Sequence, residues 1–150
     1  MSKDIERKIA VIFVTDVVAF SKMMEKNEDE TLRSFRSCRD ILDNLFKEHG
    51  GRIFNTAGDA FMIDFSSPVE AVKAAIKIQK EIFDLNNNHG KKEQLEFRVG
   101  INTGDVIIEG DNLFGDGVNV SARLEAIAPP GRICISENVH SMIPENLNVE

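Results

Sequence analysis

A run of apolar and β-branched residues near the N-terminus, Lys8 to Val14 (KIAVIFV), constrains the fold more than any other feature of the sequence. A strand with one face in water alternates apolar and polar residues, whereas this run is apolar at every position after Lys8. We therefore expect a strand that is covered on both faces and lies inside a sheet. The run ends at Thr15 and Asp16, so a carboxylate follows directly on the buried part of the strand.

Apolar residues at helical spacing recur in three parts of the chain. The first part has a break near Asn27, which predicts a short helix and then a long one that ends at Gly50-Gly51. Ser67 followed by Pro68 is typical of the start of a second long helix, because Ser favours the N-cap and Pro the first helical position. The predicted helical ranges are 19–49, 68 to the polar run 86–92, and 116–128.

The remaining apolar stretches predict strands. Residues 53–65 (IFNTAGDAFMIDF) have the pattern of two strands joined by a Gly-Asp turn, and 132–135 is a last strand. Residues 95–101 and 106–108 are expected as two strands that meet at a turn, Asn102-Thr103-Gly104-Asp105. The element order is then β-α-β-β-α-β-β-α-β. It predicts one α+β domain over residues 1–150, with a mainly antiparallel sheet, long helices on one face and a plan close to the ferredoxin-like fold.

Composition excludes some classes of partner. The net charge of −7 and the pI near 5.0 disfavour a nucleic-acid-binding surface, which depends on clustered Lys and Arg. Two cysteines, Cys38 and Cys134, are too few for a disulfide framework, which favours a reducing, cytoplasmic setting. The apolar run near the N-terminus is too short to span a bilayer, so we expect a soluble chain with no membrane segment.

Asp16 and Asp59 are the first candidates for chemistry. If the first strand lies beside the 53–65 hairpin, both carboxylates reach one edge of the sheet. Two like charges about 4 Å apart repel by about 4 kcal/mol at an effective dielectric of about 20, so such a pair requires a cation. Oxygen ligands suit Mg²⁺ or Mn²⁺. The alternative is that Asp16 is a helix N-cap and Asp59 a turn residue, and the residues alone favour that alternative.

Three further features bear on ligands. The segment after Asp16 passes from strand to helix, so backbone N–H groups there are candidates for holding phosphate; these residues are Val17, Val18, Ala19, Phe20 and Ser21. Asn119 and Arg123 are four residues apart on one helix face, which suits an anionic or hydroxyl-bearing ligand, although a surface pair without a role is equally compatible. The histidines, His49, His89 and His140, lack partners at metal-ligand spacing and are expected in solvent.

These stretches together resemble the catalytic domain of class III nucleotidyl cyclases, the adenylate and guanylate cyclases, and in particular the bacterial adenylate cyclase family. VIFVTDVVAFSKMM is similar to the family's first metal motif and HGGRIFNTAGDAFMIDF to its hairpin with the second metal Asp. FRVGINTGDVIIEGDNLFGDGVNVSARLEAIAPPGRICIS is similar to its substrate and transition-state segment. The resemblance covers nearly the whole chain and favours the metal interpretation of Asp16 and Asp59.

The resemblance implies a head-to-tail homodimer with active sites between the subunits. Asp16, Asp59 and the Val17 carbonyl would hold two divalent ions, Mg²⁺ or Mn²⁺, on one subunit. From the other subunit, Asn119 would position the ribose and Arg123 would stabilise charge on the phosphates. The expected reaction converts ATP to 3′,5′-cyclic AMP and pyrophosphate.

Two departures from the family pattern bear on this expectation. The family's adenine-contacting Lys and Asp correspond to Asn55 and Asn112 here, and an amide can pair with either purine. The family also continues beyond 132–135 into β-structure bearing a phosphate-contacting Lys, which we expect this chain to lack. The alternatives are therefore a weak or silent nucleotide-binding and dimerisation module, or a guanylate cyclase acting on GTP.

Overall fold

The computed structural model describes residues 5–88 and 94–147. Its elements follow the predicted alternation of strands and helices. The strands are β1 (Glu6–Val17), β2 (Gly51–Ala57), β3 (Ala60–Phe65), β4 (Phe97–Glu109), β5 (Asn112–Phe114) and β6 (Ile133–Ile135). The helices are α1 (Phe20–Lys26), α2 (Glu28–Glu48), α3 (Pro68–Asn88), α4 (Asp116–Ile127), α5 (Glu137–Met142) and the 3-10 turn η1 (Glu145–Leu147).

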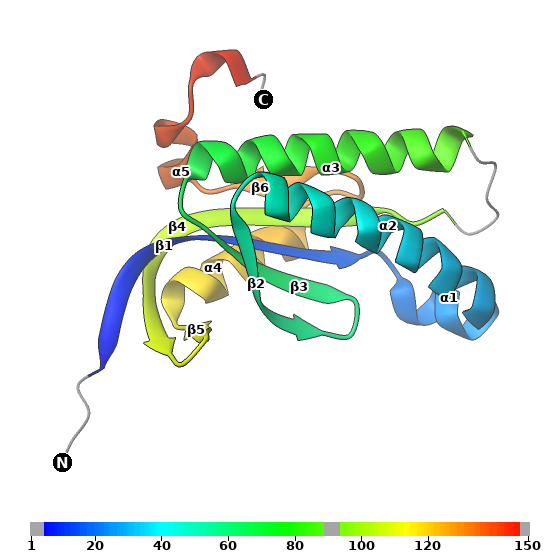
Figure 1. The fold of residues 1–150 in the computed structure, drawn as a ribbon, viewed down its shortest axis with the longest axis horizontal. Coiled ribbons are helices and arrows are strands. Elements are labelled where there is room, and N and C mark those ends of the chain that lie inside the picture. The colour runs from blue at the N-terminus through cyan, green and yellow to red at the C-terminus, as the bar shows by residue number, and fades with distance from the viewer. Residues whose placement is uncertain (1–4, 89–93, 148–150) are drawn as a thin grey trace.

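The sheet has the strand order β2-β3-β1-β4-β5, with β6 beside β4. Only β6 runs parallel to its neighbour, so the predicted mainly antiparallel sheet is confirmed. The two 21-residue helices, α2 and α3, cross one face, while the shorter α4 lies against the other (Figure 1). The α+β architecture is therefore as expected, with a second helical layer contributed by α4.

Strand β1 lies at the centre of this sheet and is covered on both faces from Ala10 on. Phe13 belongs to the core beneath α2 and α3, whereas Ile12 belongs to the core on the α4 side, and both side chains are fully buried. The Phe13 ring lies 5.2 Å from Phe46 and 5.6 Å from Phe65, between centroids. The prediction drawn from the KIAVIFV run is confirmed from Ala10 on and is wrong for Ile9, which is 70% exposed; the strand extends beyond the run at both ends.

The helix break near Asn27, the helix start at Ser67 and the helix end at Gly50 are observed where the sequence predicts them. Asn27 caps α2 by accepting a hydrogen bond from the Glu30 N–H at 3.1 Å, and Ser67 accepts one from the Glu70 N–H at 3.3 Å. Gly50 follows α2 with a φ of 78°, a left-handed conformation that favours glycine. The hairpin of β2 and β3 turns at Gly58-Asp59, as expected.

The prediction of two strands meeting at residues 102–105 is wrong. Strand β4 is continuous, because β1 pairs with it without interruption from Val17↔Phe97 to Glu6↔Ile108. Asn102 is buried within β4, and its amide donates to the Gly117 carbonyl of α4 at 3.2 Å instead of forming a turn. The chain reverses at Gly110, where φ is 61°, and the second strand of the pair is β5.

The expectation that the histidines lie in solvent is wrong for His49. This residue is 8% exposed, and its Nδ1 lies 2.9 Å from Glu70 Oε1, so it joins the end of α2 to the start of α3. His140 is exposed as expected, and His89 lies outside the described residues. Helices α5 and η1 were not predicted; Val139 of α5 is buried in the core below α3.

None of the helices within residues 5–88 and 94–147 combines the length and the apolar character needed to cross a bilayer. Cys38 and Cys134 do not form a disulfide.

Gly100 allows α4 to pack directly on β4. A Cβ atom at this position would lie 2.4 Å from the Ser121 carbonyl oxygen and 2.3 Å from the Glu125 backbone nitrogen. A hydrogen bond also holds α4 against the sheet, because the Ser121 hydroxyl donates to the Ile12 carbonyl of β1 at 3.0 Å. The glycine is therefore a packing requirement for α4.

We predict that Gly100→Ala lowers the free energy of unfolding by about 2 kcal/mol or more, since the added methyl group meets backbone that cannot move aside. Urea unfolding measures the change. Gly104→Ala is the matched control on the same strand, because its Cβ would meet mainly the end of the Asn102 side chain, at 3.1 Å. Equal losses for the two variants would contradict this account of α4 packing.

Candidate functional site

Asp16 and Asp59, predicted as a pair, are brought to the same edge of the sheet. Asp16 is the penultimate residue of β1, and Asp59 lies in the turn between β2 and β3. Pairing between β1 and β3 ends at Thr15↔Phe61, so the hairpin turn extends alongside the last residues of β1. There the Val17 N–H donates to Asp59 Oδ2 at 2.9 Å. A hydrogen bond thus joins the hairpin carboxylate to the residue after Asp16.

Arg98 is a site residue that the sequence analysis missed. It stands directly opposite Asp16 in the pairing of β1 with β4, where side chains on the same face are close enough to interact. Arg98 Nη2 lies 3.3 Å from Asp16 Oδ1 and 3.4 Å from Oδ2, and Nη1 donates to the Ala126 carbonyl at 3.1 Å. In this structure the guanidinium neutralises the Asp16 carboxylate, whose side chain is 24% exposed.

Glu125 of α4 is the second residue that was missed. Its side chain is 7% exposed, and Oε1 lies 3.4 Å from Arg98 Nε without the geometry of a hydrogen bond. Burial, followed by the hydrogen bond to Asp16 and the charges of Asp16 and Asp59, raises the pKa of Glu125 to about 8, although Arg98 opposes this. At neutral pH the buried carboxyl is therefore mainly protonated while Arg98 remains on Asp16.

The donor atoms at this edge suit a hard cation. Asp16 and Asp59 offer carboxylate oxygens, and Val17, the residue after Asp16, offers a backbone carbonyl oxygen. A set of oxygen donors of this kind matches Mg²⁺ or Mn²⁺ rather than a softer metal. Across residues 5–88 and 94–147, no group of three or more His, Cys, Asp or Glu side chains is arranged to hold a metal ion. An ion held here would draw its other ligands from backbone, water or substrate.

The strand-to-helix segment after Asp16 differs in part from the prediction of free N–H groups. The Val17 N–H is bonded to Asp59, and the Val18 N–H donates to the Glu96 carbonyl at 2.9 Å, so neither is free for phosphate. Ala19 precedes α1 with a φ of 54°, and Phe20 and Ser21 begin the helix. N–H groups in a first helical turn have no intrahelical carbonyl, so those of Phe20 and Ser21 retain the predicted character.

Asn119 and Arg123 share one face of α4, as predicted, but that face is exposed. The Arg123 side chain is 70% exposed, and its Nη2 lies 4.0 Å from Asp116 Oδ1. Ser121 and Glu125, two positions away from them, point into the protein on the opposite face of the helix. Within one chain the structure therefore presents the Asn119–Arg123 pair on the outer surface of α4, away from the buried Glu125 that borders Asp16.

Asn55 and Asn112 lie on β2 and β5, which are at opposite ends of the strand order yet approach one another. Arg52 of β2 donates to the Asp111 carbonyl at 2.8 Å, and Phe54 and Leu113 pack in the same core cluster. In each Asn, Oδ1 accepts the N–H of the next residue at 2.9 Å. Both amides therefore keep their NH₂ groups for other partners.

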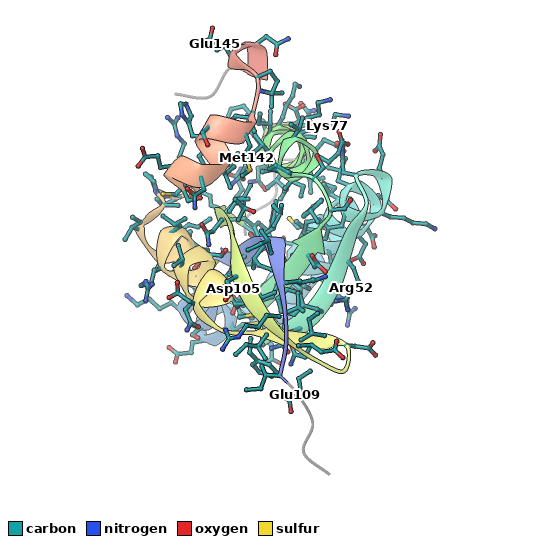
Figure 2. The ribbon with its side chains drawn as sticks, turned by 90° about the vertical axis from the view of Figure 1, so that its left-hand side faces the viewer. Arg52, Lys77, Asp105, Glu109, Met142 and Glu145 are labelled. Carbon is teal, nitrogen blue, oxygen red and sulfur yellow. The ribbon has the colours of Figure 1, made fainter. Side chains whose placement is uncertain are left out.

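A separate hollow of about 570 Å³ lies at the other end of β1 from Asp16. It is lined by residues 8–11 of β1, by Asp64 and by Met142 of α5, among others. Figure 2 faces this end of the molecule, with Met142 above and Arg52 and Asp105 on either side of β1. Lys8 and Arg52 both pair with Asp64, at 3.3 and 3.5 Å, so one carboxylate serves two cations and these three residues leave one positive charge in excess at the hollow.

The raised pKa of Glu125 predicts a pH dependence of stability. A carboxyl whose folded pKa lies above its ordinary value of 4.5 contributes stability that is complete below that value and is lost as the pH rises through about 8. In buffer with a chelator, Glu125→Gln should therefore show a smaller fall in the free energy of unfolding between about pH 5.5 and about pH 8.5. Urea unfolding measures this slope. Glu109→Gln, at an exposed site, is the control, and identical slopes for wild type and Glu125→Gln would contradict the prediction.

Comparison with known proteins gives a consistent result. The family model of the adenylate and guanylate cyclase catalytic domain matches residues 2–150. A Rhizobium meliloti protein named as an adenylate cyclase is 36% identical over 152 aligned residues, which cover 100% of this chain but 26% of that protein. The chain thus spans about a quarter of the length of that relative.

Solved structures agree with the assignment. The adenylate/guanylate cyclase/hydrolase of Silicibacter pomeroyi is similar with a TM-score of 0.83 and 37% identity, covering 92% of this chain and 81% of that one. The adenylyl cyclase CyaB of P. aeruginosa has a TM-score of 0.81 and 25% identity, with coverages of 93% and 82%. The match over nearly its whole length shows that the chain belongs to the adenylate and guanylate cyclase catalytic domain family, the class III nucleotidyl cyclases.

Proposed function

We propose that this domain converts ATP to 3′,5′-cyclic AMP and pyrophosphate with the help of two divalent ions, at sites shared between two copies of the chain. The observation that carries the proposal is the convergence of Asp16 and Asp59 at one edge of the sheet, joined through the Val17 N–H. The metal ions, when bound, would lower the pKa of the ribose 3′-hydroxyl and neutralise the triphosphate.

Two sets of residues in this chain would have different roles, one in binding the cations and one in binding the substrate. Asp16, Asp59 and the Val17 carbonyl supply the cation-binding half of a site. Asn119 and Arg123, exposed on α4, supply the other half, with the amide orienting the ribose and the guanidinium facing the phosphates. The ribose 3′-oxygen forms a bond to the α-phosphorus, the bond from that phosphorus to the pyrophosphate oxygen breaks, and the hydroxyl proton leaves to water or substrate.

The placement of the two halves supports a shared site. Arg123 lies on the outer surface of α4, while the Asp16 end of β1 lies beside the inner surface of the same helix. A substrate held by Asp16 and Asp59 of one chain would therefore meet Asn119 and Arg123 from a second chain in a head-to-tail homodimer. This division makes a specific prediction about mixed variants.

We predict that Asp16→Ala and Arg123→Ala each lower cyclic AMP formation by about a hundredfold or more, since several kcal/mol of transition-state stabilisation are lost. An equimolar mixture should regain part of the activity, because a mixed dimer contains one site with neither substitution. Product formation from ATP with Mn²⁺ or Mg²⁺ is measured by chromatography. Absence of recovery from two folded, dimerising variants would count against the shared site.

The identity of the base follows from Asn55 and Asn112. We predict that Asn55→Lys/Asn112→Asp raises the preference for ATP over GTP by about tenfold, because a fixed donor and a fixed acceptor match the adenine edge better than two amides. Competition between ATP and GTP in one reaction measures the ratio. An unchanged ratio would show that these residues do not contact the base.

The two amides also support a second candidate function, a module that binds nucleoside triphosphate with little or no turnover. Each Asn side chain already uses one lone pair of Oδ1 within its own strand, so its NH₂ donors are freer than its acceptor, whereas the adenine 6-amino group requires an acceptor. Nucleotide binding without cyclic product, with either ATP or GTP and either metal, would favour this second function.

A further inference from the structure

Glu125 has no part in the proposed reaction, yet it is one of the few buried carboxyl groups in the described part of the chain. Its Oε1 has no hydrogen-bond partner. Close packing of α4 on β4 fixes the position of Glu125, because its backbone nitrogen would lie only 2.3 Å from a Cβ atom on Gly100. A buried polar atom without a partner is costly, so its retention next to Asp16 requires a reason.

Arg98 lies between this carboxyl and Asp16. Its Nη1 is anchored on the Ala126 carbonyl, its Nη2 contacts both oxygens of Asp16, and its Nε lies 3.4 Å from the free Oε1 of Glu125. Nε also lies 3.4 Å from Asp16 Oδ1, so this nitrogen is equally distant from an oxygen of each carboxyl group. The Ala126 carbonyl that anchors Nη1 belongs to α4 and follows Glu125 directly in the chain, so the anchor keeps the guanidinium beside both residues.

The guanidinium and a divalent ion compete for the same oxygens. A cation bound to Asp16 would place at least two positive charges within a few ångströms of Arg98, a strongly repulsive arrangement in a partly buried site. Arg98 must then either leave or find another counter-ion. Besides Asp16, Glu125 is the acidic residue already in contact with Arg98 within the described residues, and a guanidinium that moves onto its carboxyl group favours the ionised form, with the proton leaving to solvent.

We propose that Arg98 occupies the cation position of Asp16 until a divalent ion binds, and that Glu125 is the positioning residue that then receives the Arg98 guanidinium. This inference rests on the proposed function, because it requires that Asp16 holds a divalent ion. It goes further in assigning roles to Arg98 and Glu125 before any nucleotide arrives. The exchange keeps the arginine paired with an acidic side chain in each state, and it gives Glu125 Oε1 a partner once the ion is bound.

The test is binding of Mn²⁺ alone, without nucleotide, measured from the electron paramagnetic resonance signal of the free ion. Arg98→Gln removes the competitor and should tighten Mn²⁺ binding about tenfold, whereas Glu125→Gln removes the receiving group and should weaken it by a similar factor. In the double variant no arginine needs a new partner, so the effect of Glu125→Gln should disappear. Simple additivity of the two effects, as expected from distant charges alone, would overturn the proposal.

Arg7→Gln is the matched control, since Arg7 forms an ion pair with Asp105 across the same two strands at 3.3 Å but in an exposed position. It should leave Mn²⁺ binding unchanged. A second measurement avoids substituted arginines: in the wild-type protein, the ¹⁵N resonance of Arg98 Nε should move on saturation with Mg²⁺. A resonance that stays in place while Mg²⁺ binds would overturn the exchange even if Arg98→Gln does not fold.

The failure of this inference is distinguishable from failure of the proposed function. If Asp16→Asn binds Mn²⁺ as well as wild type does, the cation site itself is wrong, and both the proposed function and the exchange are overturned. If Asp16→Asn abolishes binding but Arg98→Gln leaves it unchanged, the cation site stands and only the exchange is wrong.

Discussion

The two-sided pairing of β1 is the interaction on which the rest of the structure depends. β1 is hydrogen-bonded to β3 on one side and to β4 on the other, and it is covered by helices on both faces. Neighbours on both edges and both faces leave the strand little freedom to move, so its last residues are also held in place. The strand therefore fixes the position of Asp16 although that residue is only partly buried. The Val17 N–H in turn holds the hairpin carboxylate of Asp59 near Asp16.

The position of α4 depends on the same strand. Ser121 is bonded to β1, Asn102 of β4 is bonded to Gly117 at the start of the helix, and Gly100 allows close contact between them. The helix thus presents Glu125 inward toward Arg98 and Asp16, while Asn119 and Arg123 face outward. One rigid unit of β1, β4 and α4 carries both halves of the proposed site, which fixes their separation within each chain.

Much of the fold could be predicted because its signals are local. The apolar run of β1, the helix break near Asn27 and the Gly58-Asp59 turn each depend on neighbouring residues, and each is observed. The turn expected at residues 102–105 is absent because β1 pairs along the whole segment and Asn102 bonds to α4, and local propensity does not register such distant partners.

Only those residues of the candidate site that stand out in the local sequence could be predicted. Asp16 and Asp59 stood out as carboxylates at the ends of apolar segments. Arg98 and Glu125 did not, because their importance arises from register and packing: Arg98 matters since it faces Asp16 across the strands, and Glu125 since Gly100 lets α4 approach. A sequence shows Glu125 only as one charge on a mixed helix, where solvent exposure is the ordinary expectation.

The balance of charge at the Asp16 edge links these observations. Without a cation, a site with Asp16, Asp59 and Glu125 would bring three acidic groups together, and the fold would bear their repulsion. Arg98 and the protonation of Glu125 relieve it in different ways: the guanidinium pairs with Asp16, and burial together with the neighbouring carboxylates raises the pKa of Glu125. Under the proposed exchange, the groups that balance the charges at this edge are those that a bound ion would rearrange. The stability given by the Asp16–Arg98 pair and the affinity for an ion would then be opposed, and Arg98 would couple them.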